Sequence, residues 1–290
     1  MSRQGDRVAE FSDLRRFLSP DQAASPAIRL PEDGTLLRMY PAHRRPRSGS
    51  LRSDHLDVDS HWHFHDMHQL IYAFEGALEI ESHTGRHLAP RQLAAWIPAG
   101  VLHRVGLHQI SSGSVFFTTD MIEAPGDRIR TVLAAPLMRE MMREAFRWPL
   151  QGPDSPLRTS FFATMAGLCA EWIGREADLF MPTCRDARLQ RGLEYTEAKL
   201  EAKLVEVCRH AGLSERSFRR RLKLETGLTW EACRQRSRLL RAIALLGETD
   251  TPIIDVALSC GFESQSAFAK AFRAAMSETP SDYRHRVARG

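Results

Sequence analysis

The chain has 290 residues, 43% of them hydrophobic and 26% charged, values typical of a soluble globular protein with more than one domain. Five cysteines, an odd number without CxxC spacing, argue against a disulfide framework and against a zinc finger. The formal net charge of +4 is unevenly divided: residues 185–290 carry 20 Lys and Arg against 14 Asp and Glu, and the rest carries 20 against 22. We therefore expect a basic C-terminal part with an anionic partner, joined to a mildly acidic N-terminal part.

The first 55 residues contain no targeting signal. The start, MSRQGDRVAEF, lacks the apolar region of a signal peptide, and the longest apolar stretch, near residues 161–170, is too short to span a bilayer. We expect a cytoplasmic protein with no membrane partner. Residues 1–55 are rich in Pro, Arg and Ser, as in PAHRRPRSGSLRSD, which predicts a flexible N-terminal arm.

Residues 56–122 have the pattern of β-strands. Leu78 and Ile80 alternate with two glutamates, Gly76 breaks the run, and Thr84-Gly85 is a turn signal, so we expect a hairpin in an antiparallel sheet. Short strands continue through QLAAWIP and SVFFTT. Strands this short, separated by turns, favour a small barrel or sandwich.

Ten of the twelve histidines precede residue 110, and three of them stand at informative positions. His63 and His65 share one face of a strand, because side chains two residues apart point the same way. With Gln69, Gly76 and the run Pro98-x-Gly100-x-x-His103, they resemble the two cupin motifs, HxHxxxExxxxxxG and PxGxxH, with Gln69 in place of the usual glutamate. The resemblance implies a barrel that often holds a divalent metal, here through His63, His65, Gln69 and His103.

The Gln69 substitution leaves two interpretations of this site open. A neutral amide is a poorer metal ligand than a carboxylate, which argues against a cupin enzyme such as a dioxygenase or isomerase. The alternative is that the imidazoles bind an organic effector, or hydrogen-bond one another and water. We expect no required cofactor, with a divalent metal in the barrel as the alternative.

Two helical stretches follow, at residues 127–148 and 158–180, within a segment 123–181. Their apolar residues recur at helical spacing, and Pro136 limits the first helix and is expected to start a new one after it. These residues are Leu137, Met141, Met142 and Phe146, then Phe162, Met165, Leu168 and Trp172. The segment either relays a signal and forms a dimer contact or covers the open face of the barrel, and Pro182-Thr183 indicates a short linker after it.

A short pattern occurs twice in the remaining residues, 182–290. The segments at about 204–226 and 252–276 each predict a helix, a tight glycine turn and a second helix. Cys208 and Ala257 lie four residues before the turn glycines, and each second helix has large apolar residues at i, i+4. Each segment is therefore predicted to be a helix-turn-helix unit, whose second helix is shaped to enter the major groove of DNA.

A long helix is expected between the two units. Trp230, Leu239, Leu240, Ile243, Ala244 and Leu246 form an apolar stripe at helical spacing. Thr251 and Pro252 are then expected to be the N-cap and the first residue of a new helix. Such a connection would fix the separation of the two second helices.

From about residue 186 to 286 the chain resembles the DNA-binding domain of the AraC/XylS family of bacterial transcription regulators. The matching segments are AGLSERSFRRRLKLETG, RLLRAIALL, VALSCGFESQSAFAKAF and TPSDYR. The chain departs from the family at Ser277, where a glycine usually precedes Pro280. The resemblance implies base-facing positions on the two second helices, whose other polar and basic side chains suit contact with phosphates. Together they give the candidate DNA-binding residues Ser214, Arg216, Arg219, Arg220, Lys223, Gln265, Ser266, Ala269, Lys270 and Arg273.

The sequence thus predicts an α+β multidomain protein: a cupin-like antiparallel β-barrel with a helical extension, then an all-α domain with two helix-turn-helix units. The predicted function is sequence-specific regulation of transcription in response to a small molecule or metal. The expected partners are promoter DNA, an effector and a second copy of the chain, with RNA polymerase as a further candidate. The competing interpretations are a cupin enzyme fused to a DNA-binding domain and a regulator that needs no ligand.

Overall fold

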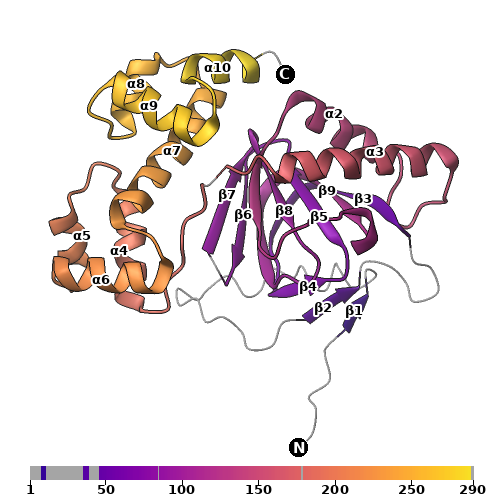
Figure 1. The fold of residues 1–290 in the computed structure, drawn as a ribbon, viewed down its shortest axis with the longest axis horizontal. Coiled ribbons are helices and arrows are strands. Elements are labelled where there is room, and N and C mark those ends of the chain that lie inside the picture. The colour runs from indigo at the N-terminus through magenta and orange to yellow at the C-terminus, as the bar shows by residue number, and fades with distance from the viewer. Residues whose placement is uncertain (1–7, 11–34, 39–45, 84, 178, 289–290) are drawn as a thin grey trace, which may run out of the picture. The chain divides into compact units, whose positions relative to one another are not determined.

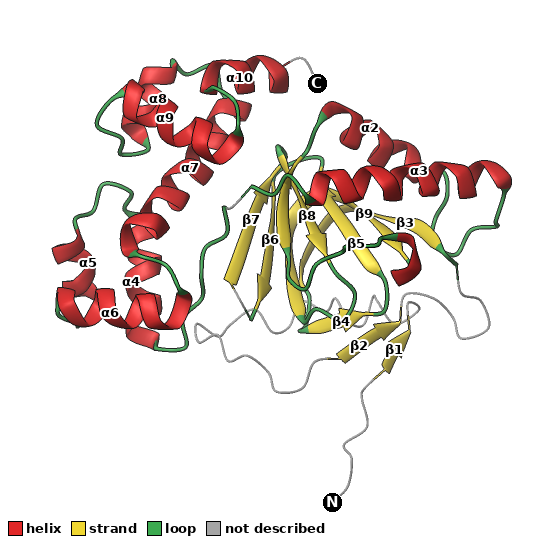
Figure 2. Cartoon of the chain, in the orientation of Figure 1, coloured by secondary structure: helices red, strands yellow, loops and turns green. Residues whose placement is uncertain are grey.

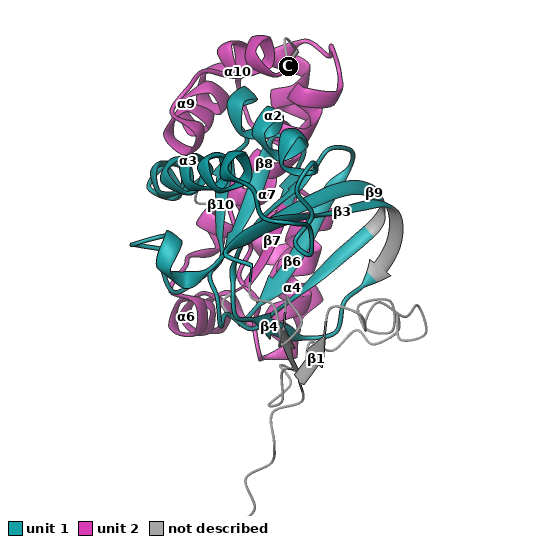
Figure 3. Ribbon diagram, turned by 90° about the vertical axis from the view of Figure 1, so that its right-hand side faces the viewer, with its two compact units in different colours: residues 1–25, 30–83, 89–177 teal, residues 26–29, 84–88, 178–290 magenta. Residues whose placement is uncertain are grey.

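The computed structural model describes residues 8–10, 35–38, 46–83, 85–177 and 179–288 (Figure 1). The chain divides into two compact units (Figure 3). Unit 1 is Met1–Ser25, Leu30–His83 and Ala89–Ala177; unit 2 is Pro26–Arg29, Thr84–Leu88 and Asp178–Gly290. Among the helices in the described ranges, none combines the length and apolar character needed to cross a membrane.

Unit 1 is built on a mainly antiparallel sheet (Figure 2). The strands of the chain are β1 (Val8–Glu10), β2 (Thr35–Arg38), β3 (Ser48–Asp59), β4 (His63–His65), β5 (His68–Ala73), β6 (Ala77–Ser82), β7 (Gly85–Pro90), β8 (Leu93–Ile97), β9 (His103–Phe117) and β10 (Arg130–Leu133). All belong to unit 1 except β7, most of which is assigned to unit 2. The order β1-β2-β4-β9-β5-β8-β10 has two open ends, with β3 and β6 also paired to β9. The expected antiparallel β-rich domain is confirmed, but no pairing among the described strands closes it into a barrel.

A flexible N-terminal arm was predicted to extend to residue 55. This prediction is wrong for residues 48–55, which lie in a strand. Strand β3 begins at Ser48 and pairs with β9 from Ser48 opposite Phe117 onwards, and the short strands β1 and β2 also lie within the expected arm. Ser48 and Ser50 are buried, and the Ser50 hydroxyl donates to the Ala145 carbonyl at 2.8 Å. The Ser50 hydroxyl can be buried in this strand because it bonds to a backbone carbonyl, and the strand lacks the apolar alternation of a typical strand.

The helical layer of unit 1 consists of η3 (Thr119–Met121), α2 (Pro136–Ala145) and α3 (Pro156–Ile173). The helical prediction for residues 127–135 is wrong, because the β-branched pair Thr131-Val132 lies in β10, antiparallel to β8. Helix α2 begins at Pro136, where the sequence predicted a new helix. The apolar stripe of α2 also differs from the expected one. Met138 and Met142 are buried, whereas Leu137 is 55% exposed.

Helices α2 and α3 pack against one face of the sheet (Figure 2). The second expected stretch, 158–180, is shorter in the structure, because α3 ends at Ile173 with Gly174 at its C-cap. Phe162 and Met165 of α3 join Leu70, Trp96 and Phe117 of the sheet in one core. This core ties the helical layer to the sheet.

Unit 2 is entirely helical in its described part from residue 187 onwards. Its helices are α4 (Ala187–Ala198), α5 (Leu204–Ala211), α6 (Glu215–Thr226), α7 (Trp230–Glu248), α8 (Ile253–Ser259), α9 (Gln265–Met276) and α10 (Pro280–Ala288). The two predicted helix-turn-helix units are confirmed as α5–α6 and α8–α9. Gly212 and Gly261 in the turns have φ of 66° and 80°, the left-handed conformation that glycine adopts without steric cost.

The boundaries near α8 and α9 follow from local backbone conformation. Pro252, not Thr251, occupies the N-cap of α8, because its ψ of 142° is extended and the helix starts one residue later. Ser277 at the C-cap of α9 has a φ of 59° and is left-handed, the one non-glycine residue with positive φ among the described residues. Serine therefore replaces the glycine usual in the family at some steric cost.

The five cysteines are buried, and none is in a disulfide. Burial raises the pKa of the Cys184 thiol to about 12 and that of the Cys233 thiol to about 11. Because the thiolate is the reactive form, these cysteines act as packing residues.

Candidate nucleic-acid interface and histidine cluster

Helix α6 presents a basic exposed face because its apolar stripe is buried. The hydroxyl of Ser214 caps the helix by accepting from the Ser217 backbone N–H at 3.3 Å, and Phe218 and Leu222 are fully buried. The remaining turns therefore carry their side chains outward. Exposed on this face are Arg216, Arg219, Arg220 and Lys223, four of the candidate residues.

These four cations are not equally available to a ligand. Arg219 forms an ion pair with Glu231 at the start of α7, with Nη1 and Oε1 2.5 Å apart, and Lys223 donates to the Gly227 carbonyl at 2.6 Å. Arg216 and Arg220 form no ion pair within the described ranges. The sequence could not distinguish these cases, because Glu231 lies beyond the end of the helix that carries Arg219.

Helix α9 presents a more neutral face. Ser264 caps it by accepting from the Ala267 backbone N–H at 3.2 Å, while Phe268 and Phe272 are buried. Gln265, Ser266, Lys270 and Arg273 are exposed and Ala269 is half-buried. An amide and a hydroxyl at the start of the helix, with cations further along, can donate to and accept from polar edges.

Helix α7 connects the two helix-turn-helix units within unit 2. Its 19 residues correspond to about 28 Å at the usual rise per residue. Trp230, Leu239, Leu240, Ile243 and Leu246 are buried as predicted, and the Trp230 indole N–H donates to Thr196 Oγ1 in α4 at 3.0 Å. The stripe therefore packs inward along most of the helix.

In unit 1, His63, His65 and His103 lie together in the sheet. His63 is paired with His103 across β4 and β9, and their ring centroids are 4.3 Å apart; those of His65 and His103 are 5.1 Å apart. All three side chains are buried. The Gln69 amide is hydrogen-bonded to His65 Nε2 at 2.9 Å and to Ser114 Oγ at 2.7 Å, so Ser114 is a member of this site that the motifs did not indicate.

Backbone carbonyls determine the tautomers of the three histidines. Nδ1 of His63 faces the His61 carbonyl at 2.8 Å, Nδ1 of His103 faces the Val101 carbonyl at 2.8 Å, and Nδ1 of His65 faces that of Met67. A carbonyl only accepts, so each Nδ1 carries the proton and donates. In the neutral ring, Nε2 is then an acceptor.

Burial keeps the three rings neutral. Removal from water lowers the pKa of His63 to about 4, against the opposing effect of its bond to the His61 carbonyl. Burial also lowers the pKa of His65, and burial together with its two imidazole neighbours lowers the pKa of His103 well below its usual range. The cluster is therefore neutral at pH 7.

The remaining acceptor of His65, its Nε2 atom, is hydrogen-bonded to the Gln69 amide. Gln69 Oε1 is placed 2.9 Å from His65 Nε2, which pairs two acceptors when the ring is neutral. Exchanging the amide oxygen and nitrogen resolves this, because Nε2–H then donates to His65 and the oxygen accepts from the Ser114 hydroxyl. His65 Nε2 is engaged in this arrangement.

The arrangement does not fit a bound metal as it stands. No group of three or more His, Cys, Asp or Glu side chains in the described residues is placed to hold a metal ion. The amide of Gln69 bonds to His65 and Ser114 rather than opening toward a shared centre. The cluster can instead offer acceptors, such as the His103 Nε2 atom, which is buried without a hydrogen-bond partner.

The lowered pKa values predict that unit 1 loses stability in acid. Between pH 6.5 and about 4 the unfolded chain binds protons that the folded cluster does not, so the free energy of unfolding should fall as pH falls through this window. Each histidine can contribute a slope of up to about 1.4 kcal/mol per pH unit. Urea unfolding at pH 7 and pH 5, followed by tryptophan fluorescence, measures it, since four of the five tryptophans lie in unit 1.

The matched variants are His103→Asn and His83→Asn. His103 is fully buried in the cluster, whereas His83 is exposed. We expect the His103 variant to flatten the pH dependence and the His83 variant to retain it. Equal pH dependence in both variants would contradict the assignment of a neutral buried cluster.

Comparison with known proteins assigns the chain to a family. Residues 207–286 match the model of a family described as a helix-turn-helix domain. The transcriptional regulator NimR of Escherichia coli (strain K12) is 27% identical over 235 residues, 78% of this chain and 83% of NimR. The regulatory protein SoxS of Salmonella typhimurium is 42% identical over 82 residues, 28% of this chain and 76% of SoxS.

Among solved structures, a transcriptional regulator with an AraC-type DNA-binding domain from Chromobacterium violaceum is 28% identical. It covers 35% of this chain and 92% of its own, with a TM-score of 0.33. The relatives matched in sequence are regulators rather than enzymes. The chain belongs to the AraC/XylS family of DNA-binding transcription regulators.

Proposed function

We propose that this regulator binds a promoter by placing α6 and α9 in successive major-groove segments, and that unit 1 senses a small molecule. The observation that carries the first part is that both helices bury an apolar stripe and expose a polar face, and that α7 joins them within one compact unit. Two reading helices on one DNA face lie about one helical turn, or ~34 Å, apart.

The two helices would contribute differently to binding. Arg216 and Arg220 of α6 supply charge that no described carboxylate neutralises, which suits phosphate contact and bidentate recognition of guanine. Gln265 of α9 supplies an amide, which suits adenine. Arg219 would have to leave Glu231 before it contacts DNA, so its net contribution is smaller than that of Arg216.

Single substitutions in the full chain test this division. Arg216→Ala and Gln265→Ala should each weaken specific binding by about 1 to 3 kcal/mol and relax preference at different bases. Arg219→Ala should cost less than Arg216→Ala. The assay is binding to a selected operator at several salt concentrations, where wild-type affinity should fall steeply as salt rises.

Arg175→Ala is the matched control, because Arg175 is an exposed arginine of unit 1. It removes the same charge and should leave affinity and base preference unchanged. Unchanged base preference in both the Arg216 and Gln265 variants would show that these residues do not recognise bases.

For unit 1, we infer that the histidine cluster lines the effector site of a cupin-like domain. Three neutral imidazoles, the Gln69 amide and the Ser114 hydroxyl provide donors and acceptors in the interior of the sheet, and a few placed polar groups are how small-molecule sites achieve specificity. A metal would require the Gln69 amide to release His65. The homodimer and the contact with RNA polymerase stay predictions from the family resemblance.

Elemental analysis and a promoter reporter separate these possibilities. Protein purified without a histidine tag should contain no stoichiometric metal, and His103→Asn should abolish the transcriptional response to the effector while the protein stays folded. Stoichiometric metal that disappears in His63→Ala and His103→Ala would replace the proposed polar site with a metal site. A normal effector response in His103→Asn would show that the histidine cluster does not bind the effector.

A further inference from the structure

We propose that Arg238 is a positioning residue for DNA recognition. By joining the two helix-turn-helix units to each other, it fixes their relative orientation and hence the half-site spacing that the protein accepts. The inference rests on the proposed function, in which α6 and α9 enter successive major-groove segments. Arg238 lies half-buried near the middle of α7 and contacts a segment on the side of each helix-turn-helix unit.

The first contact of Arg238 is with the loop that leads into α5. Arg238 Nε and Nη2 both donate to the Leu200 carbonyl, at 2.9 and 2.7 Å. Leu200 lies between α4, which ends at Ala198, and α5, which begins at Leu204. Because the donor is charged and two N–H groups share one acceptor, this contact is stronger and more directional than a bond between neutral groups.

The second contact is with the turn between α8 and α9. The Arg238 guanidinium lies over the Phe262 ring, 5.7 Å from the ring centroid. The centroids of Phe262 and Phe268 are 5.1 Å apart, and Phe268 is fully buried in α9. A displacement of this turn relative to Arg238 would therefore also disturb the packing of α9.

The backbone of the same turn approaches the Leu200 carbonyl. A Cβ atom on Gly261 would lie 3.0 Å from the Leu200 carbonyl oxygen and 3.0 Å from Arg238 Nη2. Gly261 also has a φ of 80°, a conformation that favours glycine. Glycine at this position therefore allows three segments to meet: the loop after α4, the middle of α7 and the turn before α9.

A connecting helix by itself does not fix the rotation of one helix-turn-helix unit relative to the other. Helix α7 sets the distance between them along its axis, but long helices bend, and a bend would rotate one unit about the other. A contact to the side of the helix axis removes this freedom. Arg238 supplies such a contact, because its side chain reaches from α7 to a segment on each side.

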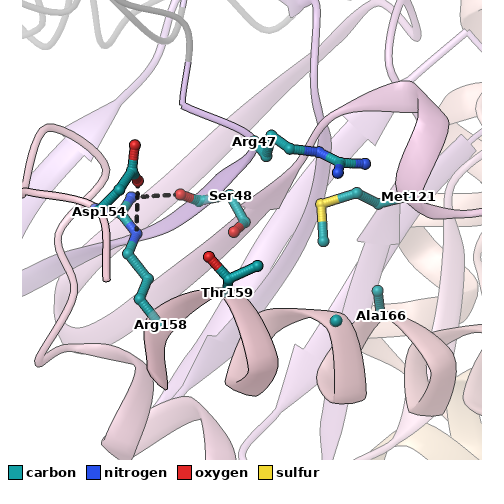
Figure 4. A pocket seen from close by; sticks show the side chains of 8 residues that line it. Arg47, Ser48, Met121, Asp154, Arg158, Thr159 and Ala166 are labelled. Carbon is teal, nitrogen blue, oxygen red and sulfur yellow. Dashed lines mark hydrogen bonds and ion pairs between the residues drawn. The ribbon is translucent and has the colours of Figure 1, made fainter. Parts of the chain in front are cut away.

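Unit 1 contains a contact of the same kind. Arg158 of α3 donates through Nη2 to the Ser48 carbonyl at the start of β3 (Figure 4) and through Nη1 to the Gly152 carbonyl at 2.6 Å. There too a guanidinium joins elements that are far apart in the chain by donating to backbone carbonyls. In unit 2 the joined elements support α6 and α9, so the contact sets the geometry of DNA recognition.

The spacing of half-sites in an operator reports this orientation. One base pair inserted between two half-sites moves one of them by about 3.4 Å along the duplex and rotates it by roughly 35° about the duplex axis. To bind both half-sites of such an operator, the helix-turn-helix units must change their relative orientation, and the bonds from Arg238 to Leu200 must break. Without these bonds the change costs less free energy.

Binding of the full chain to a selected operator, and to the same operator with one base pair inserted between its half-sites, tests the inference. The wild-type protein should prefer the selected spacing, and Arg238→Met should reduce that preference by about tenfold, the equilibrium worth of a hydrogen bond from a charged donor. Arg238→Lys keeps the charge but loses the forked donor, so its preference should fall between the two. A lost phosphate contact would weaken binding to both operators alike, so the ratio of the two affinities reports positioning.

Arg241→Met is the matched control, because Arg241 is an exposed arginine of the same helix, and this variant should retain the wild-type ratio. Urea unfolding identifies the variants that are folded. A wild-type ratio in every folded Arg238 variant, or an equal reduction in Arg241→Met, would overturn the inference and leave the proposed function intact. Equal binding of both operators by the wild-type protein would contradict the proposed function and the inference with it.

Discussion

The proposed recognition of DNA by α6 and α9 depends on the packing of α7. The helix contacts α4 near its start and α8, α9 and α10 further along. Trp230 at its first position is buried and bonded to Thr196, and Ile243 and Leu246 are buried in its second half. Because both ends are packed and no proline interrupts the helix, the separation of α6 and α9 is a property of the fold rather than of a flexible linker.

The helical unit was predictable from sequence because its signals are local. The turn glycines, the small residues Cys208 and Ala257 and the left-handed position at Ser277 each act within a few residues. The sheet was less predictable. The start of β3 and the whole of β10 depend on pairing with β9 and β8, strands far away in the chain. The polar sequence of β3 resembles a loop, and the bond from the Ser50 hydroxyl to the Ala145 carbonyl is formed only in the fold.

The same distinction applies to the candidate sites. The two-residue spacing placed His63 and His65 on one face, but only the register of β4 and β9 brings His103 opposite His63. The neutrality of the cluster follows from burial, which the motif does not reveal. Arg219 is paired with Glu231, and Gln69 is bonded to Ser114, in each case across separate elements. The sequence alone could therefore not show which of the basic or polar side chains already have a partner.

Hydroxyl-radical footprinting of the full chain on a selected operator tests the central claim most directly. If α7 holds α6 and α9 at a fixed separation, protection should appear as two patches on one face of the duplex, their centres about 10 to 10.5 base pairs apart. Gln265→Ala should weaken the patch that α9 protects and leave the other in place. A single patch, or two patches whose separation varies among operators, would contradict the account.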